Sequence, residues 1–383
     1  MKSIAIALGF LSLAAAQDVC PTLPADINFS EPALPDPFVA LDGSEITTVD
    51  AWECRREEIR DLFQRYELGP KPPKPSEVSA SFSGDQLTIN CSEDGSSISW
   101  SVQISYPSSG QAPYPAIIGY GGGSIPTPAG VASINFFNDE IADQITYNRG
   151  KFYDLYGSES SSAALIAWAW AVSRIVDALE MTPDANVDTN KLAVTGCSRN
   201  GKGAMIAGAF DDRIVLTIPQ ESGSGGPGCW RLVQQQKDQG GSVETAGQIV
   251  QGDAWFSRDF SSYTDRLDEL PYDHHMLTGL FAPRGLLIIE NTAFEWLGDM
   301  STYGCSVAGQ KIFESLGAGD NMGYSQVSHS DHCGFPSSQQ PELTAFFDKF
   351  LLDRETDTDV FKTDGNFNFD ESQWIQWDVP ELA

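Results

Sequence analysis

The sequence predicts an α/β protein, a three-layer αβα sandwich whose mostly parallel central sheet carries helices on both faces. In the second half of the chain, short apolar strands alternate with helical segments, as in folds with parallel sheets. The 383 residues are 41% hydrophobic and 20% charged, which allows a large core and argues against global disorder. No internal repeat, flexible linker or small cysteine-rich module divides the chain. We therefore expect one folded domain over residues 17–383.

Amphipathic periodicity predicts the helices. Apolar residues recur on one face from Trp52 to Tyr66, and Gly69-Pro70 should end that helix. A second stripe runs from residue 165 to 179 before Pro183, and we expect its tryptophans to pack in the core rather than to bind a ligand. Further helices are expected from residue 199 and over residues 303–316. The predicted strands are residues 99–106, 114–120, 191–195, 214–218, 286–289 and 322–328.

The first residues are typical of an export signal. Lys2 is followed by an apolar run over residues 4–13 and by small alanines at 14–16. The run is too short to span a bilayer, and the alternative is a buried N-terminal strand. We expect residues 1–16 to be removed, so that a secreted protein begins at Gln17.

The net charge limits the possible partners, and the cysteines and sequons fit a secreted protein. With 23 basic and 53 acidic residues the net charge is −30, which argues against nucleic acid or an anionic membrane as a partner. In an oxidising compartment most of the seven cysteines should pair. Asn28 and Asn90 begin glycosylation sequons.

The segment Leu192–Ala204 carries the strongest functional signal. A β-run, a turn of small residues and a helix follow one another, with Ser198 at the turn, as in a nucleophile elbow. The pattern G-x-S-x-G is met only in part, because Asn200 replaces the second glycine and Gly201 follows. The alternative is that Ser198 merely caps the helix. The glycine run at 119–123 follows an apolar strand, where it could form an oxyanion-hole loop or an ordinary turn.

A serine nucleophile needs a histidine base, which comes last in the chain in this arrangement. His274 and His275 precede the strand at 286 and are expected to be structural. His329 and His332 follow the last strand. We choose His332, because Cys333 adjoins it and Cys197 adjoins Ser198, so a disulfide between them would join the two loops.

An acidic residue should orient that imidazole. Glu221 follows the strand at 214–218 and precedes a glycine-rich loop. Glu290, one strand later, and Asp299 are the alternatives, and position alone does not decide among them.

With these segments identified, the chain resembles the fungal glucuronoyl esterases, secreted serine hydrolases with the α/β-hydrolase fold. The resemblance covers nearly the whole mature chain and depends most on two specific segments, 196–204 and 332–336. Other matching segments are Cys54-Arg55-Arg56, Tyr66–Pro70, Ala167–Trp170, Pro219–Gly223, Cys229-Trp230-Arg231, Glu290-Asn291 and Trp296-Leu297-Gly298.

The resemblance implies roles for individual residues. Ser198 would be the nucleophile, Glu221 the acid and His332 the base, and Arg199 would contribute its backbone N–H and its side chain to the oxyanion hole. It also implies disulfides Cys20–Cys54, Cys197–Cys333 and Cys229–Cys305, with Cys91 free.

The resemblance further implies a substrate, an ester between (4-O-methyl-)glucuronic acid of glucuronoxylan and a lignin alcohol. Lys202 and Trp296 would line the sugar pocket. Glu244 stands where the family has Gln, and Gly252 where it has Glu, so the sugar preference could differ. No cofactor, metal or carbohydrate-binding module is expected, and the protein is expected to be a monomer. The alternatives are an esterase for acetyl or feruloyl groups, or a non-catalytic wall-binding protein.

Overall fold

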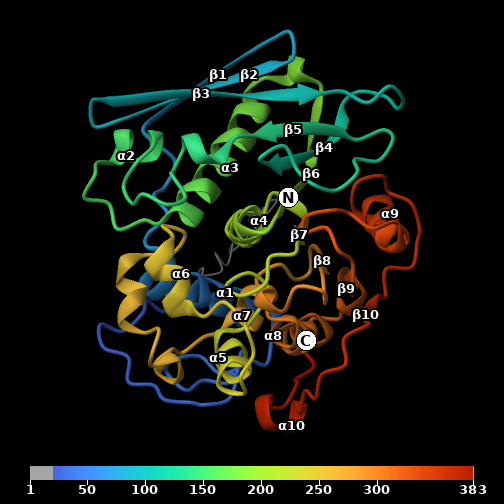
Figure 1. Cartoon of the computed structure of the whole chain (residues 1–383). Coiled ribbons are helices and arrows are strands. Elements are labelled where there is room, and N and C mark those ends of the chain that lie inside the picture. The colour runs from blue at the N-terminus through green and yellow to red at the C-terminus, as the bar shows by residue number, and fades with distance from the viewer. Residues whose placement is uncertain (1–19, 383) are drawn as a thin grey trace, which may run out of the picture.

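A computed structural model describes residues 20–382, so the predicted signal at 1–16 and the predicted start at Gln17 lie outside the described residues. The core is a ten-stranded sheet in the order β1-β2-β3-β5-β4-β6-β7-β8-β9-β10 (Figure 1). The strands are β1 (Glu77–Ser83), β2 (Gln86–Glu93), β3 (Ser96–Ser105), β4 (Tyr114–Tyr120), β5 (Ala132–Phe136), β6 (Val187–Cys197), β7 (Ile214–Gln220), β8 (Gly285–Glu290), β9 (Met322–Gln326) and β10 (Phe361–Thr363). The α-helices are α1 (Val49–Phe63), α2 (Lys151–Tyr156), α3 (Ala164–Met181), α4 (Arg199–Ala209), α5 (Trp230–Asp238), α6 (Ala246–Gly252), α7 (His274–Gly279), α8 (Asp299–Ser315), α9 (Gln340–Phe350) and α10 (Glu371–Trp374).

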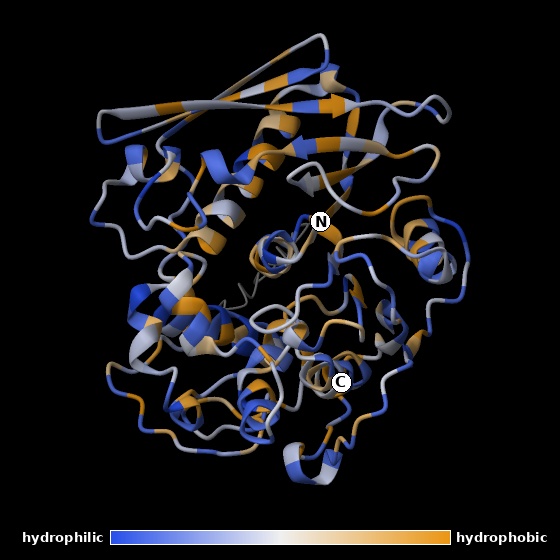
Figure 2. Ribbon diagram, viewed as in Figure 1, coloured by the Kyte–Doolittle hydropathy of each residue, from blue (hydrophilic) through white to orange (hydrophobic). Residues whose placement is uncertain are grey.

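The sheet is mostly parallel, as predicted. From β5 through β4, β6, β7, β8 and β9 to β10 every neighbouring pair is parallel. The antiparallel part is the β1-β2-β3 meander, which joins the rest through β3 and β5. The β3 ribbon alternates between hydrophobic and hydrophilic colours in Figure 2, matching its alternation of buried and exposed residues.

Apolar side chains pack on both faces of the sheet, in two separate clusters. On one face, Ala193, Leu216 and Leu287 pack with apolar residues of α9. On the other, Val194 and Ile288 belong to the larger core that includes α3, α4 and α7. The expected three-layer arrangement is therefore present, with most helices on one side (Figure 1).

The first helix ends where its sequence predicts, and begins at Val49, three residues before the predicted apolar face at Trp52. Thr48 accepts a hydrogen bond from the Ala51 N–H and caps α1, and the last turn continues as a π-helix, η1 (Gln64–Leu68). Gly69 follows with a φ of 73°, and a Cβ there would collide with the Ser161 carbonyl. Only glycine fits this turn, which therefore ends the helix.

The tryptophans of α3 are core residues. Trp168 and Trp170 are both 0% exposed, and the Trp168 indole donates to the Ala142 carbonyl at 2.9 Å. The prediction that they pack rather than bind a ligand is confirmed. Among the described residues, no helix is long and apolar enough to cross a bilayer.

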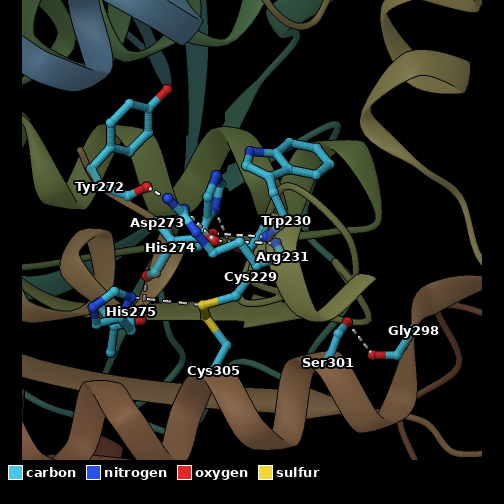
Figure 3. Close-up of a disulfide and its surroundings, with 12 residues drawn as sticks. Cys229, Trp230, Arg231, Tyr272, Asp273, His274, His275, Gly298, Ser301 and Cys305 are labelled. Carbon is cyan, nitrogen blue, oxygen red and sulfur yellow. Dashed lines mark hydrogen bonds and ion pairs between the residues drawn. A yellow bond between two sulfur atoms is a disulfide. The ribbon is translucent and has the colours of Figure 1, made fainter. Parts of the chain in front are cut away.

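His274 and His275 lie in a buried polar cluster next to the Cys229–Cys305 disulfide (Figure 3). His274 contacts the Glu67 carboxylate at 2.9 Å and the Gly226 carbonyl at 2.6 Å. Although burial opposes a charge there, the contact with Glu67 raises the pKa of His274. Since both partners accept hydrogen bonds, His274 is a structural imidazolium, consistent with the structural role expected for it.

His275 should make the protein acid-sensitive. Burial lowers its pKa to about 4, while its Nε2–H donates to the Pro35 carbonyl at 2.9 Å. The unfolded chain, with a histidine pKa of about 6.5, therefore binds a proton that the folded chain does not. Stability should fall by up to about 3 kcal/mol as the pH drops from 6.5 to 4. Urea unfolding at several pH values checks this, and His275→Gln, which keeps a donor for Pro35, should be less acid-sensitive. Equal acid sensitivity in both proteins would contradict the assignment.

Candidate active site

Ser198 occupies a sharp turn between β6 and α4. Its φ of 58° and ψ of −128° lie outside the regions that residues other than glycine favour, a strain that typically costs about 1–3 kcal/mol. The turn is held because the Ser198 N–H donates to the Gln220 carbonyl at 2.9 Å, while its own carbonyl accepts from Gly201 and Lys202. The hydroxyl makes no capping hydrogen bond to the helix. The serine therefore does not serve as a side-chain cap, and the geometry is that of a nucleophile elbow.

Close packing explains why the glycine pattern is shifted. A Cβ at Gly196 would collide with the Asn200 carbonyl, and one at Gly201 with Ser222. The second required glycine is thus Gly201, one position later than in G-x-S-x-G. Asn200 is free to carry a side chain, which accepts a hydrogen bond from the Asn138 amide at 3.0 Å.

The acid and the base meet behind this turn. The Glu221 carboxylate is fully buried and lies 2.7 Å from Nδ1 of His332. It also accepts from the Cys333 N–H at 3.1 Å. His329 approaches the other carboxylate oxygen with Nε2 at 3.1 Å, so both candidate histidines contact Glu221. Of the two imidazoles, that of His332 is the more exposed, at 28% against 14%.

The predicted disulfide connects the serine turn to the histidine loop. Cys197 and Cys333 are bonded with a Cα–Cα distance of 5.6 Å, and the other two predicted pairs are also present, leaving Cys91 as a buried free thiol. A ring nitrogen of His332 lies within 4.8 Å of both sulfurs. This histidine is therefore held against the residue that precedes Ser198. Cys197, His332 and Cys333 together do not form a metal site, because both cysteine sulfurs are bonded to each other in the disulfide.

Removing this disulfide should reduce both stability and turnover. Cys197→Ser with Cys333→Ser opens a loop of 136 residues and should cost about 5 kcal/mol of unfolding free energy. Because the histidine loop loses its link to the serine turn, kcat should also fall. The matched control removes Cys229–Cys305, which spans 76 residues and should cost about 4.5 kcal/mol with little change in kcat. Denaturant unfolding and steady-state kinetics measure both effects; equal kcat losses in the two variants would contradict a specific role.

The N-terminus of α4 is the clearest candidate for oxyanion stabilisation. Arg199 is its first residue, so its N–H has no acceptor within the helix. The Arg199 guanidinium forms an ion pair with Asp139 at 2.9 Å instead of lying free. In the 119–123 run, the N–H groups of Gly121, Gly122 and Gly123 all donate to backbone carbonyls. Gly121 donates to Phe136 on β5 and the other two donate within the run, so these N–H groups are already used in this structure.

Lys202 lies one turn after Ser198 and is 3% exposed. Its ammonium donates to the Ser222 carbonyl at 2.6 Å and lies 5.1 Å from the centre of the Trp255 ring. Burial lowers the pKa of Lys202, while the neighbouring carboxylates of Glu244 and Asp253 oppose that shift. A buried cation beside the serine is suited to binding polar or anionic groups of a ligand.

Trp296 and Glu244 lie close to the same site. The Trp296 ring packs edge-to-face on the His332 imidazole, with 4.7 Å between the ring centres. The backbone carbonyl of Trp296 accepts from the Glu244 N–H at 3.1 Å. Both side chains are half-buried. A Cβ at Gly252 would meet no atom within 4 Å, so its lack of a side chain leaves open space.

The two sequons differ in their surroundings. Asn28 is exposed, whereas Asn90 lies half-buried on β2 with its amide 3.5 Å from the Ser79 hydroxyl. Glycosylation at either position stays a prediction.

Gln220 is a site residue that the sequence did not reveal. Its amide donates to the Gly334 carbonyl at 3.0 Å and its side-chain oxygen accepts from Ser124 at 2.6 Å, while its backbone carbonyl holds Ser198. Its position next to Glu221 was the available signal.

The sheet has helices on both faces, a serine elbow at the end of β6 and, at the end of the neighbouring β7, a glutamate that contacts a histidine. These features define the α/β-hydrolase class. The family model for fungal glucuronyl esterases matches residues 89–317. A 4-O-methyl-glucuronoyl methylesterase of Hypocrea jecorina is 55% identical over 368 residues, covering 95% of this chain and 79% of that protein. One of Schizophyllum commune is 48% identical over 382 residues and covers 97% of each.

Solved structures agree. The glucuronoyl esterase catalytic domain of Hypocrea jecorina superposes with a TM-score of 0.92 at 55% identity, over 94% of this chain and all of that one. A serine-to-alanine mutant of the Sporotrichum thermophile enzyme, in complex with methyl 4-O-methyl-β-D-glucopyranuronate, has a TM-score of 0.92 at 45% identity, over 96% of this chain and all of that one. The chain belongs to the fungal glucuronoyl esterase family and is an esterase.

Proposed function

We propose that this protein is a secreted serine esterase that cleaves esters between (4-O-methyl-)glucuronic acid of glucuronoxylan and lignin alcohols. The observation that carries the proposal is the contact between Glu221 and His332, held by a disulfide beside the strained turn of Ser198. The glucuronate complex of the Sporotrichum relative supports the acid part of the ester. The three disulfides and the N-terminal apolar run support secretion. Residues 17–383 would form a single catalytic domain.

In the proposed mechanism, His332 removes the hydroxyl proton of Ser198, which attacks the uronate carbonyl. Glu221, bound to Nδ1, fixes the ring so that Nε2 acts as the base, and stabilises the imidazolium that forms. The N–H of Arg199 at the start of α4 stabilises the oxyanion, an interaction worth about 3–4 kcal/mol per donor. The guanidinium could assist only after leaving Asp139. His332 then protonates the departing alcohol, and water hydrolyses the acyl-enzyme.

Lys202 and Trp296 would bind the sugar. The Lys202 ammonium has donors left beyond the one that Ser222 uses, and these can reach hydroxyl groups of the uronate. Trp296, packed on His332, offers an aromatic face beside the reacting centre. Glu244 would accept hydrogen bonds where an amide would both donate and accept.

Lys202→Met should separate this function from a general esterase. Because the variant loses a charged donor to the sugar but keeps an unbranched side chain, kcat/KM on a benzyl glucuronate ester should fall about tenfold to a hundredfold. Activity on 4-nitrophenyl acetate, which has no sugar, should stay within about threefold. Steady-state kinetics on both substrates measures the ratio. If wild-type enzyme preferred the acetate, or both activities fell equally in the variant, acetyl ester hydrolysis would be favoured instead.

A further inference from the structure

The turn after β7 is held from three sides. Glu221, the first residue of this turn, has a φ of 44°, an unusual value for a residue other than glycine. Its N–H donates to the Ile289 carbonyl at 2.7 Å. The next two N–H groups, of Ser222 and Gly223, both donate to Oε1 of Glu290, at 2.8 and 3.1 Å. On the opposite side, the Ser222 carbonyl accepts from Lys202 at 2.6 Å.

Glu290 is a buried carboxyl group with one oxygen fully engaged. Its side chain is 1% exposed, and Oε2 has no hydrogen-bond partner among the described residues. Burial raises the pKa of Glu290 to about 8; the N–H groups of Gly223 and Ser222 oppose the shift, the Glu221 charge adds to it, and Lys202 opposes it. Tyr324 on β9 also faces the group, and burial raises the pKa of its phenol well above the ordinary value. Glu290 is therefore neutral at pH 6.

The contacts of Glu290 differ from those of Glu221, the residue that orients His332. The carboxylate that contacts His332 and the Cys333 N–H is that of Glu221. Glu290 Oε1 instead joins two consecutive backbone N–H groups of the turn that carries Glu221. Since Lys202 binds the peptide between these groups, Glu290 is linked to both the acid and the lysine through Ser222.

We propose that Glu290 is a positioning residue: its carboxyl group fixes the 221–223 turn, which aims Glu221 at His332 and places the Ser222 carbonyl within reach of the Lys202 ammonium. The proposal rests on the function proposed above for Glu221 and Lys202. A neutral acid suits this place, because its carbonyl oxygen accepts both N–H groups without adding a second negative charge beside Glu221.

Two variants test this proposal. Glu290→Gln keeps the accepting oxygen without a titratable group, whereas Glu290→Leu removes the acceptor. On benzyl glucuronate at pH 6, Glu290→Leu should lower kcat at least tenfold and raise KM, because both Glu221 and Lys202 lose their support. Glu290→Gln should recover most of that loss. A loss of about a thousandfold in Glu290→Gln, or unchanged kcat and KM in Glu290→Leu, would overturn the proposal.

Stability provides a readout that needs no substrate. The folded pKa exceeds the unfolded one, so ionisation in the unfolded state destabilises wild type progressively as the pH rises from about 4.5 to 8. The Tm of Glu290→Gln relative to wild type should therefore rise by several degrees from pH 5 to pH 8, while hydrogen exchange in the 221–223 peptide stays slow. A Tm difference that does not depend on pH would overturn the neutral assignment. If Glu290→Leu does not fold, the Glu290→Gln results decide alone. Should Ser198→Ala retain full turnover, the proposed function would fail while these substrate-free results still stand.

Discussion

Replacing Ser198 with alanine should lower kcat on a benzyl glucuronate ester by about ten-thousandfold to a millionfold. The hydroxyl is the proposed nucleophile, and no other group at the elbow can form the acyl-enzyme. The fold should be kept, because the turn depends on backbone contacts to Gln220, Gly201 and Lys202 rather than on the side chain. Single-turnover and steady-state kinetics measure the loss, with Tm as the check on folding.

Ser261→Ala is the matched control, since this exposed serine donates only to the Arg258 carbonyl, far from the elbow in sequence. Its kcat should match wild type. Full activity in Ser198→Ala would mean that the esterase uses another nucleophile.

Glu221→Gln should reduce kcat by about a thousandfold to ten-thousandfold. The buried carboxylate accepts from His332 Nδ1 and from the Cys333 N–H, and an amide that presents its NH₂ to that ring would favour the wrong tautomer. The volume is unchanged, so stability should change far less than the rate. The pH dependence of kcat/KM and denaturant unfolding measure the two effects.

Asp299→Asn is the control for this result, because Asp299 was an alternative acid in the sequence. In the structure Asp299 is the first residue of α8, and its carboxylate accepts from the Gln236 amide at 2.7 Å and from the Met300 N–H at 2.8 Å. Its variant should stay within about threefold of wild-type kcat. A larger loss in Asp299→Asn than in Glu221→Gln would contradict the assignment of the acid.

The central fold was predictable because β4 and β8 are apolar runs, β7 is rich in β-branched residues and β3 alternates between apolar and polar residues. The predicted strands correspond to β3, β4, β6, β7, β8 and β9, although β6 begins at Val187 and β9 ends at Gln326. The sequence did not reveal β1, β2 and β5. β1 is rich in Ser and contains no fully buried residue, β2 buries only alternate residues, and β5 is short, so their stability depends on pairing with neighbours rather than on local pattern.

The start of α8 could not be predicted from the sequence either. This helix was expected over 303–316, but Gly298, with a φ of 78°, allows it to begin at Asp299. Start signals of this kind depend on a left-handed turn that single residues do not specify.

The order of strands along the chain predicted where the active site lies, but side-chain contacts were needed to decide which acidic residue orients the histidine. Glu221 follows β7 and Glu290 ends the adjacent parallel strand β8, so sequence position could not separate them. The left-handed backbone at Glu221 turns its carboxylate toward His332, whereas Glu290 accepts from the turn itself. The sequence placed His329 in the same loop as His332, but did not show that both would contact the same carboxylate. Nor did it show that Asp139 would hold the Arg199 guanidinium, because that pairing depends on a loop 60 residues upstream.

The most direct test of the account is to label the protein with diethyl 4-nitrophenyl phosphate and map the adduct by peptide mass spectrometry. We predict one phosphoryl group per chain, on Ser198, formed in wild type and far more slowly in His332→Ala. Labelling at another residue, or at the same rate without the imidazole, would contradict the claim that these two side chains act together.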